Sequence, residues 1–103
     1  MIEEITTDKF EEKVLEASVP VLVDFSAVWC GPCQALRPTL EQISKECAGR
    51  ANICSIDIDE CRDLAQKYKI TAVPAMLLFK DGVECARLVG LQQKEAIENL
   101  LLK

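Results

Sequence analysis

The sequence predicts an α/β domain in which a mixed β-sheet carries helices on both faces. Over the first two thirds of the 103 residues, segments with the period of a helix alternate with apolar strand-like segments. The last third reads as a β-hairpin followed by a helix, so the sheet contains antiparallel as well as parallel neighbours. We expect residues 1–103 to form a single domain, because this length is close to the usual domain size.

The first two elements are a helix and a buried strand. Residues 8–18 place Phe10 and Val14 on one face, and Asp8 is available as the helix cap. Residues 20–27, "PVLVDFSA", are almost continuously apolar. Such a run is typical of a central strand that is covered on both faces.

A longer helix is predicted from Gly31 to Ala48, and Gly49 is its stop signal. Pro38 lies inside it and removes one backbone hydrogen bond, so we expect a kink there. A single buried stripe should run along the helix through Leu36, Leu40, Ile43 and Cys47.

The remaining elements are a strand over 51–58, a helix over 59–69, hairpin strands over 75–80 and 83–89, and a helix over 92–103. Asp59 is expected to cap the first of these helices. Pro74 stands directly before a strand, and a proline cannot donate to a central ladder. It therefore marks a turn or a cis peptide bond.

Composition excludes several classes of function. The net charge of −5 argues against nucleic acid as a partner, because binding to phosphates needs a surplus of Lys and Arg. The apolar runs are far shorter than the ~20 residues of a membrane span, and the N-terminus lacks the pattern of a signal peptide. We therefore expect a cytoplasmic protein without a membrane partner, in a compartment that keeps thiols reduced.

The motif "WCGPC" places two cysteines where a strand gives way to a helix. Free N–H groups and the helix dipole favour a thiolate at Cys30. Cys33 lies one turn further on, within reach of a disulfide with Cys30. Gly31 leaves the approach open, and Pro32 suits a first helical turn. Cys30 can thus attack a foreign disulfide, and Cys33 can then resolve the mixed disulfide.

Other interpretations of this motif remain open. The pair could be a structural disulfide or half of a zinc site, although the chain has no histidine and no second CxxC motif. We expect no metal. A binding module with dispensable thiols, or a metal cluster shared by two chains, would be separated from redox chemistry by serine substitutions and by metal analysis.

Asp24 is an acid inside the buried strand "VLVDF". Burial disfavours the charged carboxylate, so we expect a raised pKa. Such an acid near a dithiol can take and return the proton of the resolving thiol of Cys33. The alternative is a carboxylate bonded to neighbouring backbone at a strand end.

The sequence resembles the thioredoxin family over essentially its whole length. The segments that carry the resemblance are "VDFSA", "WCGPC", the "VP" ahead of the hairpin and "FKDG…VG" after it. The resemblance implies the thioredoxin fold, with a five-stranded mixed sheet in the order 1-3-2-4-5 and four flanking helices. It also implies a monomeric thiol-disulfide oxidoreductase that reduces disulfides in target proteins and is regenerated by a thioredoxin reductase.

The resemblance further implies roles for individual residues. Cys30 would be the nucleophile, Cys33 the resolving thiol and Asp24 the proton relay. No bound cofactor is implied beyond the redox-active disulfide of Cys30 and Cys33. Gly31 and Pro32 belong to the catalytic motif, and this dipeptide is found in the reducing members of the superfamily. The implied substrate-binding residues are Trp29, Val73, the cis-proline position Pro74, and Gly90, which lets the last loop approach the site.

Three residues depart from the family pattern near the site: Gln34, Ser55 and Ala75. The first two stand where family members often carry a positive charge. We therefore expect a higher pKa for Cys30 and an Asp24 that is harder to ionise.

The remaining four cysteines have separate interpretations. Cys47 and Cys54 follow apolar stripes and should be inert core residues. Cys61 could be a regulatory thiol, as the cysteine at this place is in some animal thioredoxins, or a packing residue. Cys85 lies on the second hairpin strand, where the pattern favours neither role.

Overall fold

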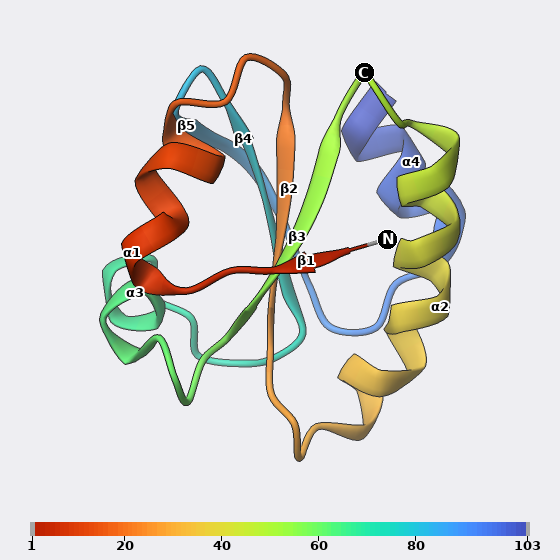
Figure 1. Cartoon of the computed structure of the whole chain (residues 1–103). Coiled ribbons are helices and arrows are strands. Elements are labelled where there is room, and N and C mark those ends of the chain that lie inside the picture. The colour runs from red at the N-terminus through yellow and green to blue at the C-terminus, as the bar shows by residue number, and fades with distance from the viewer. Residues whose placement is uncertain (1, 103) are drawn as a thin grey trace.

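A computed structural model describes residues 2–102, and within them one five-stranded mixed sheet carries helices on both faces (Figure 1). The strands run in the order β1-β3-β2-β4-β5, which confirms the expected order. β1 and β2 are parallel to β3, whereas β4 is antiparallel to β2 and β5 is antiparallel to β4. Their bounds are Glu3–Glu4 for β1, Val21–Ser26 for β2, Asn52–Asp57 for β3, Ala75–Lys80 for β4 and Val83–Val89 for β5.

The helices lie in pairs on the two sides of the sheet. In Figure 1, α1 and α3 are on one side, and α2 and α4 are on the other. α1 continues directly into a π-helical segment, η1. Their bounds are Thr7–Phe10 for α1, Glu11–Leu15 for η1, Arg62–Lys67 for α3, Gly31–Glu46 for α2 and Lys94–Leu102 for α4.

The central strand β2 explains the long apolar run. Every residue from Val21 to Phe25 is buried, because alternate side chains enter two different cores. One core contains Val23 and Phe25 with the side chains of α1, η1 and α3. The other contains Leu22 and the predicted buried stripe of α2. Burial of each such large apolar side chain contributes ~1.5–3 kcal/mol to stability.

The first strand could not be located from the sequence pattern. β1 has two residues, Glu3 and Glu4, which pair with Cys54 and Ser55 of β3. Two residues cannot display a strand period, and both side chains are exposed glutamates. The resemblance therefore implied a fifth strand that the pattern itself did not locate.

Two predicted helix caps are wrong. Thr6, not Asp8, is the N-cap of α1, and its hydroxyl donates to the Asp8 carboxylate in the first turn. The third helix begins at Arg62 rather than at Asp59. The Asp57 carboxylate accepts the Asp59 N–H at 2.8 Å, and this turn holds the chain out of the helix.

Helix bounds also differ from the expectation at other points. The first helical segment ends at Leu15 instead of residue 18, and α4 begins at Lys94 instead of residue 92. Lys103, the expected last residue of that helix, lies outside the described residues. α2 continues through Pro38, which lies on its exposed face, where water can bind the carbonyl that the proline leaves free.

Candidate active site

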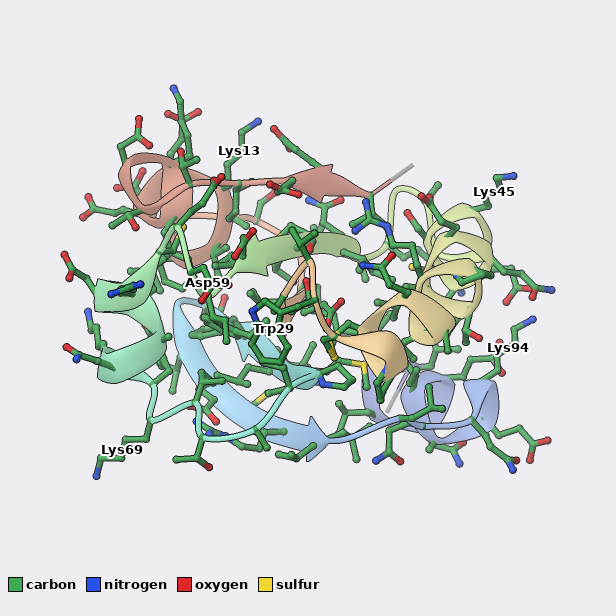
Figure 2. All side chains as sticks on the ribbon, turned by 90° about the horizontal axis from the view of Figure 1, so that it is seen from below. Lys13, Trp29, Lys45, Asp59, Lys69 and Lys94 are labelled. Atoms are coloured by element: carbon green, nitrogen blue, oxygen red, sulfur yellow. A yellow bond between two sulfur atoms is a disulfide. The ribbon has the colours of Figure 1, made fainter. Side chains whose placement is uncertain are left out.

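Cys30 and Cys33 form a disulfide at the start of α2, directly after the loop that follows β2 (Figure 2). Their Cα atoms are 5.3 Å apart, within the usual range for a disulfide. Cys30 is the N-cap of α2, and the backbone N–H of Cys33 donates to its sulfur at 3.1 Å. This N–H and the helix dipole would stabilise negative charge on the same sulfur after reduction.

The disulfide is almost enclosed by apolar side chains. Cys30 and Cys33 are 5% and 4% exposed, and they pack with Ala27, Ile58 and Val73. Gly31, by contrast, is exposed, and apart from its chain neighbours and the backbone of its own helix no atom lies within 4 Å of the position that a Cβ would occupy. The missing side chain thus leaves open space beside the sulfurs.

The segment between α3 and β4, which contains Val73 and Pro74, also reaches the disulfide. The Val73–Pro74 peptide bond is cis, as the resemblance implied for Pro74. The carbonyl oxygen of Val73 lies 3.7 Å from Cys30 Sγ. Val73 therefore brings its backbone next to the sulfur that is expected to react.

Gly90 connects the loop between β5 and α4 to the segment that contains Pro74. Its N–H donates to the Pro74 carbonyl oxygen at 2.7 Å, and its φ of +91° lies in the region that L residues rarely adopt. The structure therefore brings the predicted residues 73, 74 and 90 together, and Val73 is the one that contacts the disulfide.

Trp29 is fixed by a contact that the sequence pattern did not reveal. The residue is 68% exposed, and its Nε1–H donates to the Asp59 carboxylate at 2.8 Å (Figure 2). The two residues are 30 positions apart, so no local spacing could have signalled the pair. A cavity of ≈ 280 Å³ lies beside the ring, and its other walls come from Ile58 and residues 70–73.

Asp24 is buried in the middle of β2, with 2% of its surface exposed. Among the described residues, no group forms a hydrogen bond with its Oδ1 atom. Burial raises the pKa of the carboxyl group to about 7, while the positive charge of Arg37 acts in the opposite direction. This confirms the expected rise in pKa, and the missing partner argues against a carboxylate that is bonded to neighbouring backbone.

As predicted, the β3 neighbour of Asp24 carries no positive charge, but a positive side chain of α2 also acts on Asp24. Ser55 is the register partner of Asp24 on β3, and its hydroxyl oxygen lies 3.4 Å from that of Ser26. Arg37, which the sequence motifs did not single out, lies on α2 four residues after Cys33, and its positive charge lowers the Asp24 pKa. That spacing of one helical turn is the signal that could have identified it.

The four other cysteines are free, and three of them are buried: Cys47, Cys54 and Cys61. Burial raises the pKa of Cys47, and it raises that of Cys54 to about 12, so both are core residues as predicted, and neither is expected to form a reactive thiolate. Cys61 is 2% exposed and packs in the core near Leu64, which favours its packing role. Cys85 is exposed.

Within residues 2–102, no three side chains of His, Cys, Asp or Glu lie close enough together to hold a metal ion. Of the helices in this part of the chain, none is long and apolar enough to cross a membrane.

Comparisons with known proteins agree on one family. The family model described as "Thioredoxin" matches residues 1–103. A thioredoxin of Chlamydia pneumoniae is 44% identical over 103 residues, covering 100% of this chain and 98% of the relative. Thioredoxin C-2 of Corynebacterium nephridii is 49% identical over 85 residues, 82% of this chain and 79% of the relative. A thioredoxin of Rickettsia felis is 41% identical over 97 residues, 94% of this chain and 92% of the relative.

Proposed function

The chain belongs to the thioredoxin family and is a dithiol-disulfide oxidoreductase, and we propose that it works as a reductant of protein disulfides through Cys30 and Cys33. The observation that carries the proposal is the Cys30–Cys33 disulfide at the N-terminus of α2, beside an exposed glycine. The Gly31-Pro32 dipeptide between the cysteines agrees with a reducing role.

The proposed reaction has two exchange steps. The Cys30 thiolate attacks one sulfur of a target disulfide, forms a mixed disulfide, and releases the other target sulfur as a thiolate. The Cys33 thiolate then attacks Cys30 Sγ, forms the disulfide seen here, and releases the second target sulfur. Two electrons pass to the target, which gains two protons and becomes a dithiol.

We assign the proton transfer in the second step to Asp24. Cys33 must lose its proton before it attacks, and a base is most effective when its pKa lies near the working pH. A buried carboxyl group with a pKa of about 7 meets this condition. In the reduced protein, Asp24 would therefore accept the Cys33 proton as a carboxylate and carry it as a carboxylic acid.

Target binding is assigned to the backbone and side chains around the disulfide. An extended target segment can pair with the backbone at Val73, because Pro74 turns the chain there and the Val73 carbonyl lies next to Cys30. Trp29 and Gly90 complete the proposed surface. The cavity beside Trp29 would then receive an apolar side chain of the target.

We also propose the wider setting. Residues 1–103 would act as one domain and as a monomer, in the cytoplasm, where a thioredoxin reductase regenerates the dithiol. Disulfide-containing proteins would be the targets, and neither nucleic acid nor membrane would be a partner. The absence of surplus positive charge and the reducing role support these assignments.

Trapping of the mixed disulfide tests the proposal. The Cys33→Ser variant should remain covalently attached to a disulfide-containing protein such as insulin, because nothing resolves the intermediate. The Cys30→Ser variant should form no such adduct and should lose turnover with a thioredoxin reductase and NADPH. Adducts on Cys30→Ser and none on Cys33→Ser would reverse the assigned roles, and full turnover by both variants would refute them.

A further inference from the structure

The chain between α3 and β4 carries the Val73 carbonyl to the disulfide but has few backbone hydrogen bonds of its own. Lys69 and Ile70 donate back to carbonyl oxygens of α3. Within residues 2–102, no group accepts a hydrogen bond from the N–H groups of residues 71–73. Lys69 also has a φ of +55°, where its Cβ crowds the following carbonyl oxygen. Neighbouring elements must therefore help to hold this segment in place.

The strand β5 and the glycine that follows it contact both ends of this segment. At the far end, the Gly90 N–H donates to the Pro74 carbonyl oxygen, as described above. At the near end, Arg87 Nη2 donates to the Tyr68 carbonyl oxygen at 3.0 Å. Tyr68 is the C-cap of α3, and the last carbonyl groups of a helix have no partner within the helix. Arg87 thus caps the end of α3 from a neighbouring strand.

A second interaction fixes the direction of the Arg87 guanidinium. Its Nε and Nη2 atoms donate to the two carboxylate oxygens of Glu84 at 2.7 and 2.9 Å. Two parallel hydrogen bonds of this kind restrict the orientation of the planar guanidinium. Both side chains are partly exposed, and such ion pairs contribute little to stability. The main effect of the pair is therefore on the geometry of Arg87.

The meeting of Glu84 and Arg87 depends on an irregularity in β5. Residues three positions apart on a regular strand point to opposite faces of the sheet. A β-bulge at Cys85 removes this conflict, because it adds one residue to β5 between the positions that pair with Leu78 and Phe79. With this residue added, both side chains lie on the face of the sheet that α3 covers. The bulge therefore directs Arg87 toward α3.

We propose that Arg87 positions residues 69–73 for the binding of protein targets, and that the β-bulge directs its guanidinium to this task. The proposal rests on the target-binding role given above to the Val73 backbone. Residues 70–73 also line the cavity beside Trp29, so a displacement of this segment would change both proposed contacts with a target. Arg87 acts through this segment and is a positioning residue.

Oxidation of the reduced protein by two disulfides of different size tests the proposal. Arg87→Ala should lower the second-order rate constant with insulin about three- to tenfold, the effect of losing one hydrogen bond. The rate constant with hydroxyethyl disulfide should stay unchanged, because this compound has no peptide segment to pair with Val73. Arg50→Ala is the matched control and should change neither rate constant. Arg50 Nη2 likewise donates to a carbonyl oxygen at a helix end, that of Glu46 in α2, at 3.2 Å.

A second variant and a second readout separate positioning from other effects. Glu84→Ala keeps the arginine but removes its partner, so it should lower the insulin rate constant in the same direction. NMR order parameters of the backbone N–H groups of residues 70–73 in the oxidised protein should fall in Arg87→Ala and not in Arg50→Ala.

Three results would overturn the proposal. They are an insulin rate constant that is unchanged in Arg87→Ala, an equal loss with both disulfides, and unchanged order parameters. If Arg87→Ala does not fold, an insulin rate constant that is unchanged in Glu84→Ala overturns it.

The proposed function fails under a different result. If Cys30→Ser reduces insulin at the rate of the original chain, then Cys30 is not the nucleophile. The order parameters of the Arg87→Ala variant would still report whether the arginine holds the segment in place.

Discussion

Burial of Asp24 lowers the stability of the folded protein near neutral pH, although the proposed proton transfer uses this residue. The unfolded chain ionises at this position near the ordinary pKa of 3.8, whereas the folded protein holds the proton until about pH 7. Between these values the folded state binds more protons, so its stability falls as the pH rises through the window. The difference between the two pKa values corresponds to ~4 kcal/mol above pH 7.

Asp24→Asn should remove this loss of stability. The free energy of unfolding of the variant relative to the original chain should grow between about pH 4 and pH 7, by up to ~4 kcal/mol. Urea unfolding at a series of pH values measures the difference. Asp63→Asn, which changes an exposed aspartate on α3, is the control and should show no comparable growth. A difference between the Asp24→Asn and original chains that does not vary with pH would contradict the account.

The free thiols should differ in reactivity according to their burial. In the folded, oxidised protein, iodoacetamide should label Cys85, which is exposed, and should leave Cys47, Cys54 and Cys61 unlabelled. After unfolding in urea, all four should react, which serves as the internal control. Mass spectrometry of the labelled peptides measures this. Labelling of Cys61 as fast as that of Cys85 would contradict the packing role and support a regulatory thiol.

At the scale of elements, the loop between β5 and α4 is held to the active site by one glycine. Gly90 has a φ of +91° and donates to the Pro74 carbonyl oxygen. Gly49, at the end of α2, has a φ of +85° and, like Gly90, has no atom within 4 Å of an added Cβ. The two glycines therefore impose the same backbone strain at two different places.

Gly90→Ala and Gly49→Ala form a matched pair. Each should lower the free energy of unfolding by about 1–2 kcal/mol, because alanine disfavours a positive φ. Only Gly90→Ala should also raise the KM for a protein disulfide, since its strain would move the loop at the active site. Equal KM values for the two variants would show that this loop does not contribute to target binding.

The elements that could be predicted from sequence are those with a strong period. The apolar run of β2 and the stripe of α2 indicated both elements because many buried positions repeat. β1 was missed because two exposed residues carry no period. The start of α3 was misplaced because a local turn at Asp57 competes with helix formation, and such competition leaves several possible start positions.

For the whole molecule, the sequence does not show which residues from distant segments come together in the folded structure. "WCGPC" at a strand-to-helix junction indicated redox chemistry from local spacing alone. The family resemblance, not the local pattern, brought Pro74 and Gly90 to the cysteines. The Trp29–Asp59 hydrogen bond and the cavity between Ser55 and Arg37 depend on how α2 and the ends of β2 and β3 are placed. No short stretch of sequence contains that information.

The central claim is that one pair of the six cysteines exchanges electrons. The most direct measurement equilibrates the protein in graded dithiol/disulfide buffers, traps the free thiols, and maps them by mass spectrometry. We expect Cys30 and Cys33 to switch together, with a potential more reducing than about −220 mV, the upper end of the cytosolic glutathione range. The three buried cysteines, Cys47, Cys54 and Cys61, should stay reduced throughout. A pair that stays reduced in every buffer, or that switches only under oxidising conditions, would contradict the account.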